Sequence, residues 1–414
     1  MSDAPHNTIA YLIPEFPGQT HIWMWREIVH MREWNVPVRI FSTRRPPARD
    51  RARHDFAPAA GAETMYLWPP GVGRAAAAVL WAIFTRPGAL WRCLKLALTL
   101  PVERNERKTN RLVPLILPAC ILAREIVRQR IGHVHCHSCS AAAVLCMMNK
   151  HLTAVPFSLT LNANIEWWGG AMKEKFEAAE FTIAITQWLL EQMKRDFPTL
   201  REDQALLGRI GVDTTKWHPR PAEPDESAAA ANGATVLTLA RLHPSKGHDV
   251  LLRAVAMLHD QGVDLRLRLA GDGPHRGDLE ALTRELKLDG RVSFLGSIAE
   301  SDCIREMHRA DVFVLASHAE PLGVAYMEAM AAGIPTIGTA AGGVGEIISS
   351  GRDGLLVPPG DAASLAAAIR QLLDDAALRR RLSAAGRQTI VQRFDSRLGA
   401  ATLYQRIFHR PPPR

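Results

Sequence analysis

Residues 316–347 read ASHAEPLGVAYMEAMAAGIPTIGTAAGGVGEI, and they follow an apolar stretch that ends at Leu315. The apolar stretch predicts a buried strand, and the segment after it predicts a helix from about Gly323. Glu320 then falls in the loop and Glu328 inside the helix. A loop that enters a helix offers free backbone N–H groups and the positive end of the helix dipole. We therefore expect this segment to bind a diphosphate, while Glu328 accepts hydrogen bonds from a vicinal diol such as a ribose.

Short apolar runs alternate with longer amphipathic stretches on both sides of this segment, in the order strand, crossover helix and parallel strand. This alternation predicts a doubly wound α/β fold. The strands expected from it are 8–13, 36–42, 131–136, 157–161 and 181–186 in the first half, and 236–240, 265–270, 292–295, 312–316, 336–338 and 354–357 in the second.

A chain of 414 residues is too long for one ordinary core, so we expect two domains. A stretch rich in Pro, Ala and small polar residues at 216–233 predicts the linker between domains 1–215 and 234–393. Residues 394–414 predict a closing helix that packs back toward the first domain. Two open sheets joined by one linker predict a cleft between them, with ligands at the carboxyl ends of the strands.

The composition is that of a globular protein, with 47% hydrophobic and 22% charged residues. No stretch reaches the roughly 20 uncharged apolar residues of a membrane span. The N-terminal residues MSDAPHNTIAYLIPEF lack a basic flank and a small-residue cleavage site, so we expect no secretory signal and a cytoplasmic location. Six cysteines in so long a chain predict reduced thiols, most of them in the core.

The net charge of +8 favours an anionic partner, whether a nucleotide diphosphate, an anionic lipid or a nucleic acid. Nucleic acid is the least expected of these, because no nucleic-acid motif is present. Residues 71–130 combine Trp81, Trp91 and aliphatic runs with many cations, which suits contact with an anionic membrane on the inner face of the cell membrane. Helices that pack on the first domain with a solvated basic face are an equal alternative. The cations are Arg74, Arg86, Arg92, Lys95, Arg104, Arg107, Lys108 and Arg111.

Two cations precede the quoted segment in LTLARLHPSKGHDVLLRAV. Arg241 comes just past a strand and Lys246 lies at the turn before a helix, a spacing that can clamp one pyrophosphate. After the next strand, Gly271 and Gly273 allow positive φ and a close backbone approach beneath a ligand. The pair Gly342 and Gly343 opens another loop, which we interpret as part of the cleft wall, and Glu346 then starts a helix.

The pattern of a Glu, seven residues, a second Glu, AMAAGIP and a GG pair resembles the donor-site signature of family 4 of the retaining glycosyltransferases. The resemblance is most specific in the second half and is closest to bacterial exopolysaccharide-assembly members. It implies the GT-B fold of two Rossmann-like domains, with no metal and no cofactor. It places Arg241 and Lys246 on the donor phosphates, Glu320 on the sugar hydroxyls and Glu328 on the ribose. It also implies a diphosphate on the turn of Pro321, Leu322, Gly323 and Val324, and a base near Gly296 and Ser297.

In the first half, IPEFPGQTHIWMWREI predicts a Pro-Gly turn between a strand and a helix, where the family has its acceptor-facing loop. Gly18, Gln19 and Thr20 are therefore acceptor-side candidates, whereas Arg26 and Glu27 are equally well explained as an ordinary pair on the helix surface.

Asn162 stands where the family commonly has a histidine in the pattern Thr, any residue, His. An imidazole there would bond the transferred sugar. An amide offers a hydrogen-bond donor and an acceptor but takes no proton near neutral pH, so the substitution bears on activity or sugar choice. Trp167 is a candidate to stack on an acceptor sugar ring, with burial in the core as the alternative.

The cluster HVHCHSCS raises the possibility of zinc, because it contains His133, His135, His137, Cys136 and Cys139. Alternation places the three histidines on one face of a strand end, whereas tetrahedral zinc needs ligands from more than one segment. We therefore expect no metal, and place His137 near the cleft on the acceptor side.

The sequence thus predicts a retaining glycosyltransferase that moves a sugar from a nucleotide diphosphate to a glycan or polyprenyl-linked acceptor, in bacterial polysaccharide biosynthesis. Two alternatives stay open. One is a nucleotide-sugar epimerase of the same fold, which needs no acceptor. The other is a non-catalytic subunit that only binds nucleotide sugars.

Overall fold

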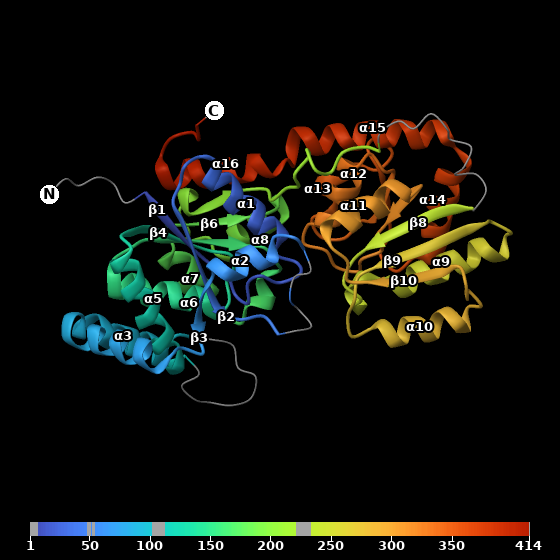
Figure 1. The fold of residues 1–414 in the computed structure, drawn as a ribbon. Helices are drawn as coiled ribbons and strands as arrows, with labels where there is room; N and C mark the ends of the chain where they lie inside the picture. The colour runs from blue at the N-terminus through green and yellow to red at the C-terminus, as the bar shows by residue number, and fades with distance from the viewer. Residues whose placement is uncertain (1–6, 48–50, 52–53, 102–111, 221–232, 414) are drawn as a thin grey trace. The chain divides into compact units, whose positions relative to one another are not determined.

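Both halves of the chain fold around a parallel β-sheet in the computed structural model (Figure 1). The structure describes residues 7–47, 51, 54–101, 112–220 and 233–413. Two compact units are present. The first comprises Met1–Ala52, Phe56–Arg209 and Ala400–Arg414, and the second comprises Arg53–Asp55 and Ile210–Gly399. Most of the expected linker, and part of the expected insertion at 71–130, lie outside the described residues.

The sheet of the first unit has the strand order β3-β2-β1-β4-β5-β6-β7, and every neighbouring pair is parallel. Its strands are β1 Thr8–Leu12, β2 Val38–Arg44, β3 Met65–Trp68, β4 Ile131–Cys136, β5 Phe157–Leu161, β6 Phe181–Ala184 and β7 Ala205–Leu207. Its helices are α1 Ile22–Glu33, α2 Ala57–Glu63, α3 Val72–Thr85, α4 Pro87–Thr99, α5 Ile116–Arg128, α6 Ala141–Thr153, α7 Met172–Ala178 and α8 Gln187–Asp196, with a short 3₁₀ helix η3 at Ile165–Trp168.

The second unit repeats this plan with the order β10-β9-β8-β11-β12-β13, again entirely parallel. Its strands are β8 Ala234–Leu239, β9 Leu265–Ala270, β10 Val292–Gly296, β11 Val312–Val314, β12 Thr336–Thr339 and β13 Leu355–Val357. Its helices are α9 His248–Asp260, α10 Arg276–Glu285, α11 Glu300–Arg309, α12 Val324–Ala331, α13 Val344–Ile347, α14 Ala362–Asp374 and α15 Ala376–Arg393, with a 3₁₀ turn η6 at Pro244–Lys246.

The predicted doubly wound α/β fold is confirmed, and each predicted strand is present. Central strands bury both faces under helices, so they read as continuous apolar runs. The sequence analysis missed β3 and β7, which are short strands at the two edges of the first sheet, where only part of each strand is buried. All six cysteines are free, and five of them are buried. Within the described residues, no helix combines the length and apolar content needed to cross a bilayer.

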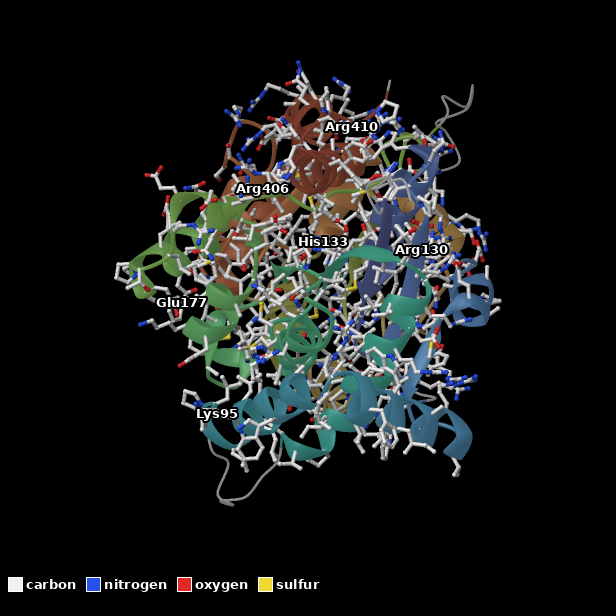
Figure 2. The ribbon with its side chains drawn as sticks, turned by 90° about the vertical axis from the view of Figure 1, so that its left-hand side faces the viewer. Lys95, Arg130, His133, Glu177, Arg406 and Arg410 are labelled. Carbon is white, nitrogen blue, oxygen red and sulfur yellow. The ribbon has the colours of Figure 1, made fainter. Side chains whose placement is uncertain are left out.

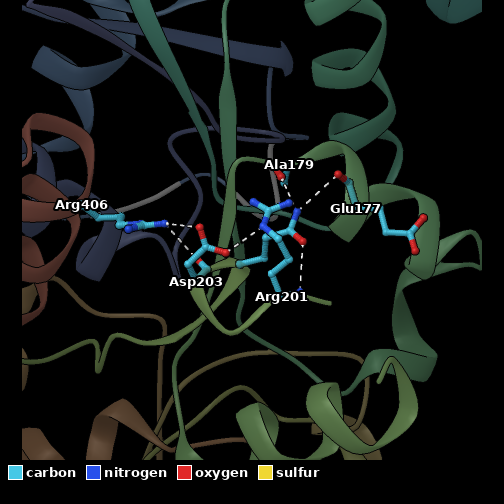
Figure 3. A network of polar contacts seen from close by, with 6 residues as sticks. Glu177, Ala179, Arg201, Asp203 and Arg406 are labelled. Carbon is cyan, nitrogen blue, oxygen red and sulfur yellow. Dashed lines mark hydrogen bonds and ion pairs between the residues drawn. The ribbon is translucent and has the colours of Figure 1, made fainter. Parts of the chain in front are cut away.

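The last helix, α16 at Ser396–Phe408, contributes to the core of the first unit through Leu403 and Tyr404. The Tyr404 ring lies edge-on against Trp34, with 5.4 Å between centroids. Figure 3 shows the polar anchor beside it: Arg406 donates to the Asp203 backbone oxygen at 2.9 Å, and Arg201 pairs with the Asp203 carboxylate at 3.0 Å. Hydrogen bonds from Arg201 are the largest cause that lowers the Asp203 pKa. The closing helix therefore has an apolar and an ionic attachment to the unit that begins the chain.

Two buried histidines, His133 and His135, lie on β4 in the centre of the first sheet. His133 bonds the Ser158 hydroxyl at 2.7 Å, and His135 bonds the same hydroxyl at 2.8 Å and that of Thr160 at 3.0 Å. Burial lowers the pKa of His133 to about 3 and holds that of His135 well below its ordinary value. Both imidazoles are therefore neutral at physiological pH. Hydroxyl groups on β5 bond both ring nitrogens of His135 and Nε2 of His133, whose Nδ1 lies 3.5 Å from the Glu180 carboxylate.

These histidines make stability depend on pH. The pKa of His133 is about 3 in the folded state and about 6.5 in the unfolded chain. Between these values the unfolded state binds more protons, so the free energy of unfolding falls as the pH drops from 6.5 toward 3. The expected slope is about 1.4 kcal/mol per pH unit for each such histidine. His133→Gln keeps an amide that can bond Ser158 but cannot titrate, so urea unfolding at a series of pH values should show a shallower dependence. An unchanged slope would contradict this assignment.

Candidate active site

The predicted donor loops meet where the strand order of the second sheet reverses. Strands β8 and β11 are neighbours, with Val236 paired to Val312, although β9 and β10 come between them in sequence. Such a switch point leaves a crevice at the carboxyl ends of the strands, because the connections on either side run in opposite directions. Arg241 follows β8 and Glu320 follows β11. The topology therefore brings both predicted loops to this crevice.

An ion pair joins the two loops. The Lys246 ammonium, at the end of η6, lies 2.6 Å from the Glu320 carboxylate. The Glu320 side chain is only 8% exposed and also accepts from the Ser317 hydroxyl at 3.3 Å. The backbone ties the same loops, since the His318 N–H donates to the Ser245 oxygen at 2.9 Å. The structure thus brings together Lys246 and Glu320, which the sequence placed 74 residues apart.

The GG pair fixes the backbone of Glu320. The Gly343 N–H donates to the Glu320 carbonyl oxygen at 3.1 Å, and Gly342 has a φ of +54°. A Cβ on Gly342 would overlap that same carbonyl oxygen. The pair was interpreted from sequence as cleft wall, and its contact in the structure is with the predicted catalytic loop. Gly342 therefore has both a backbone and a packing reason to be glycine.

The loop after β9 lies directly beneath Arg241. Gly271 has a φ of +147°, and a Cβ there would overlap the Ala240 carbonyl oxygen. A Cβ on Gly273 would overlap the Leu242 carbonyl oxygen, but Gly273 does not have the positive φ expected from sequence. The close backbone approach expected at Gly271 and Gly273 is therefore made to another loop of the protein, the one that carries Arg241. The Arg241 side chain above them is exposed and has no ion-pair partner within the described part of the chain.

The remaining donor-side residues border these loops. The Gly271 N–H donates to the Gly296 oxygen at 2.8 Å, which joins the expected base region to the loop under Arg241, and Ser297 is partly buried beside it. Gly323 caps the start of α12; Leu322 is buried, whereas Pro321 and Val324 are partly exposed. Glu328 lies on α12 as predicted and is partly buried. Burial of the Cys303 thiol on α11 is the largest cause that raises its pKa, and the charge of Glu328 is the next largest.

The first unit has its own switch point, between β1 and β4, where Leu12 pairs with Cys136. The turn with Gly18, Gln19 and Thr20 follows β1, and His137 follows β4. Gly18 donates its N–H to the His21 ring at 3.0 Å. The pKa of His21 is lowered to about 4, mainly by burial and further by His137. The acceptor-side turn and His137 are therefore close to one another.

His137 is held by groups from two elements, α1 and β5. Its ring lies 3.1 Å from the Thr160 hydroxyl, 3.2 Å from the Glu27 carboxylate and 4.9 Å, centroid to centroid, from Trp23. The alternative of Arg26 and Glu27 as a surface pair is wrong, because Arg26 is buried and the Glu27 side chain is 13% exposed. The sequence analysis left the role of Glu27 open and missed Trp23. The available signal was their four-residue spacing, which puts both on one face of α1.

Two other acceptor-side candidates follow β5. Asn162 directly follows that strand and is partly buried, and its side-chain oxygen has no hydrogen-bond partner among the described residues. Trp167 lies on η3 and is 58% exposed, so the alternative of burial in the core is wrong for this residue. The buried Lys175 orders the segment that follows Trp167, because the Lys175 ammonium donates to the Trp168 and Gly170 oxygens at 3.1 and 2.8 Å.

One group among the described residues has the composition of a metal site. Glu27, His135 and His137 each offer a ligand atom, and these atoms lie within 4.8 Å of one another. The ring nitrogens of His135 already bond the hydroxyls of Ser158 and Thr160, so metal binding would have to replace one of those bonds. The expectation of a protein without metal stays a prediction.

Comparison with known proteins agrees with this geometry. Residues 219–389 match the family model of glycosyl transferases group 1. The chain is 40% identical over 181 residues to the lipopolysaccharide core biosynthesis glycosyltransferase LpsD of Rhizobium meliloti, covering 43% of this chain and 51% of LpsD. It is 33% identical over 187 residues to the glycogen synthase of Mycobacterium tuberculosis, covering 45% of this chain and 44% of that enzyme. The chain thus spans about half the length of these curated relatives.

The similarity in fold extends over nearly the whole chain. The crystal structure of Anabaena Alr3699/HepE in complex with UDP and glucose superposes with a TM-score of 0.70 at 18% identity, covering 96% of this chain and 98% of that one. At this identity the match shows the fold alone. The chain therefore has the GT-B fold, and residues 219–389, which lie in the second unit, match the family model of glycosyl transferases group 1. The predicted cleft between the two domains stays a prediction.

The role of Gly342 can be tested by thermodynamics. Gly342→Ala forces a side chain into a left-handed conformation against the Glu320 carbonyl oxygen, so the free energy of unfolding should fall by about 1–3 kcal/mol. Gly345→Ala is the matched control, because its Cβ would enter open space in α13 and should leave stability unchanged or slightly higher. Urea unfolding of both variants measures the difference. Equal stability of the two variants would refute the assigned role of Gly342.

Proposed function

We propose that this protein is a retaining glycosyltransferase that transfers a sugar from a nucleotide diphosphate donor to a glycan or polyprenyl-linked acceptor, in bacterial polysaccharide biosynthesis. The observation that carries the proposal is the Lys246–Glu320 pair at the switch point of the second sheet, within the segment that matches glycosyl transferases group 1. The relatives in lipopolysaccharide synthesis support the acceptor class, and the UDP complex of the Anabaena protein supports the donor class.

The donor diphosphate would lie between Arg241, Lys246 and the first N–H groups of α12. An ammonium has three N–H donors, and Glu320 takes one of them at 2.6 Å, which leaves two for phosphate oxygens. The Lys246 side chain is 25% exposed, so a ligand can reach it. Negative charge that develops on the leaving diphosphate is stabilised by these fixed donors without a metal or a cofactor.

Glu320 would bind Lys246 and the hydroxyls of the donor sugar at the same time. One carboxylate oxygen accepts from Lys246 and Ser317, and a carboxylate has further lone pairs for the hydroxyls of the donor sugar. The Gly343 hydrogen bond fixes the residue at its backbone, so the carboxylate is preorganised before the donor arrives. Glu328, one helix turn or more into α12, would accept the ribose hydroxyls.

On the acceptor side, His137 and Asn162 end neighbouring strands of the first sheet. Glu27 lies 3.2 Å from His137 and orients its ring. Asn162 presents a side-chain oxygen without a partner, as expected of a group that waits for a hydroxyl donor. The turn of Gly18, Gln19 and Thr20 and the exposed Trp167 would complete the acceptor contacts. The cytoplasmic location stays a prediction.

The proposed donor site is tested by removing the ammonium group of Lys246. Lys246→Ala should raise the barrier for transfer by about 2–4 kcal/mol, because it removes a charge-assisted contact to the leaving group. Arg241→Ala should act in the same direction. Lys216→Ala is the control, since Lys216 also pairs with a glutamate of its unit, Glu300 at 3.5 Å, but is not among the predicted donor residues. The measurement is kcat/KM with the donor found by a thermal-shift screen of nucleotide sugars. Wild-type turnover by Lys246→Ala would defeat the phosphate assignment.

Incubation with the donor alone separates the competing functions. A glycosyltransferase should leave the sugar configuration unchanged without acceptor, whereas an epimerase would invert one carbon under the same conditions. A binding subunit would show wild-type nucleotide affinity and no transfer to any acceptor. Asn162→His restores the imidazole that the family commonly has, so a gain in transfer would assign residue 162 to the reaction. A subunit without activity would not respond to this substitution.

A further inference from the structure

The outer faces of α3 and α4 expose large apolar side chains. Phe84 is 80% exposed, Trp91 67% and Val72 87%. On α3 the exposed positions recur every three or four residues, so they form one stripe along the helix. We call these residues the α3–α4 surface; they are Val72, Leu80, Ile83, Phe84, Trp91 and Leu98. Soluble monomers rarely expose so continuous an apolar patch without a binding role.

The packing of both helices is complete without this surface. Helix α3 packs on α5 and α4 packs on α6, through small residues such as Ala78, Ala82 and Cys93. The Cys93 thiol donates to the Met148 oxygen at 3.4 Å, which seats α4 closely on α6. Figure 1 shows α3 along the outside of α5. Small residues therefore make the fully buried contacts of both helices, while the large side chains of the α3–α4 surface face solvent.

Among the described residues, the unpaired charges on the helices around this surface are positive. Helices α3, α4 and α6 contain no Asp or Glu, and the single carboxylate of α5, Glu125, is bonded by Arg128 at 2.7 Å. The exposed cations that flank the apolar stripe are Arg74, Arg86, Arg92 and Lys95. Figure 2 shows Lys95 at the periphery of the unit. The pKa of His151 on α6 is lowered by burial and further by Arg92 and Lys150, as expected in a positive field.

We propose that the α3–α4 surface binds an anionic phospholipid bilayer, with Trp91 and Phe84 in the interfacial region and the four cations at the headgroups. Aromatic side chains prefer this interface, and each nearby Lys or Arg strengthens attachment to anionic lipid. A second copy of the chain fits less well, because a symmetric dimer would set the same cations against each other. The proposal goes beyond the proposed reaction, and it holds or fails whether or not the protein transfers a sugar.

Flotation of the full chain with lipid vesicles tests the proposal. The protein should float with phosphatidylcholine vesicles that contain phosphatidylglycerol and should stay unbound with phosphatidylcholine alone. High salt should weaken the binding, because it screens the headgroup charges. No flotation with the anionic vesicles, or equal flotation with both kinds, would overturn the proposal.

Variants locate the contact on the molecule. The double variant Phe84→Ser and Trp91→Ser should bind anionic vesicles about tenfold more weakly. Trp167→Ser is the matched control for an exposed aromatic residue and should bind as the wild type does. Removing Arg92 or Lys95 should weaken binding about fivefold each, whereas the exposed Arg253 on α9 should be neutral.

Thermal unfolding checks that these variants fold. Because the substituted side chains are exposed, their Tm should match that of the wild type, so a loss of vesicle binding reports the surface and not the fold. Sedimentation of the wild type tests whether a second copy of the chain binds the α3–α4 surface instead of lipid. Dimerisation that depends on Trp91, without vesicle binding, would assign the surface to a protein partner and refute the lipid proposal.

Discussion

The reversal of strand order in two parallel sheets is the constraint on which the rest of the structure depends. In a parallel sheet every strand ends at the same edge, so residues that follow separate strands meet there regardless of their distance in sequence. At the reversal between β8 and β11 the crossovers leave on opposite faces, which keeps that part of the edge open. Lys246 and Glu320 meet at this edge in the second unit, and the turn after β1 meets His137 in the first.

Contacts between backbone segments hold the loops around Arg241 and Glu320 in place. The Gly343 N–H holds the Glu320 oxygen, and the Gly271 loop approaches so close beneath Ala240 that no side chain fits. A buried carboxylate is costly without a partner, and Lys246 supplies that partner in the protein without its ligand. The same ammonium is reachable from solvent. An anionic ligand can therefore join a charged site that is already assembled, with little reorganisation on binding.

The first unit uses a different chemistry at the equivalent edge. Its central strand buries imidazoles that stay neutral, and the hydroxyls of β5 satisfy them. His137, past the end of β4, lies 3.2 Å from the Glu27 carboxylate, whereas His133 and His135 lie 3.5 and 3.9 Å from the nearest carboxylate. His133 and His135 lie within the strand, whereas His137 lies past its end. Helices α3 and α4 lie on the same unit, and their outer faces combine exposed aromatic residues with cations, the features expected of a lipid-binding surface.

The sequence by itself determined the fold class and the central strands, and it located the loops that carry Lys246 and Glu320, because each of these depends on a local pattern. A fully buried strand is a continuous apolar run, and the loop-to-helix spacing of Glu320 and Glu328 is fixed over nine residues of chain. The edge strands β3 and β7 were missed, since strands buried on part of their surface lack that pattern. Only the tertiary structure decided that Lys246 pairs with Glu320, that Gly342 supports Glu320 and that Glu27 turns inward to His137. These contacts join segments far apart along the chain, and their partners are chosen by strand order and helix packing, which no local spacing encodes.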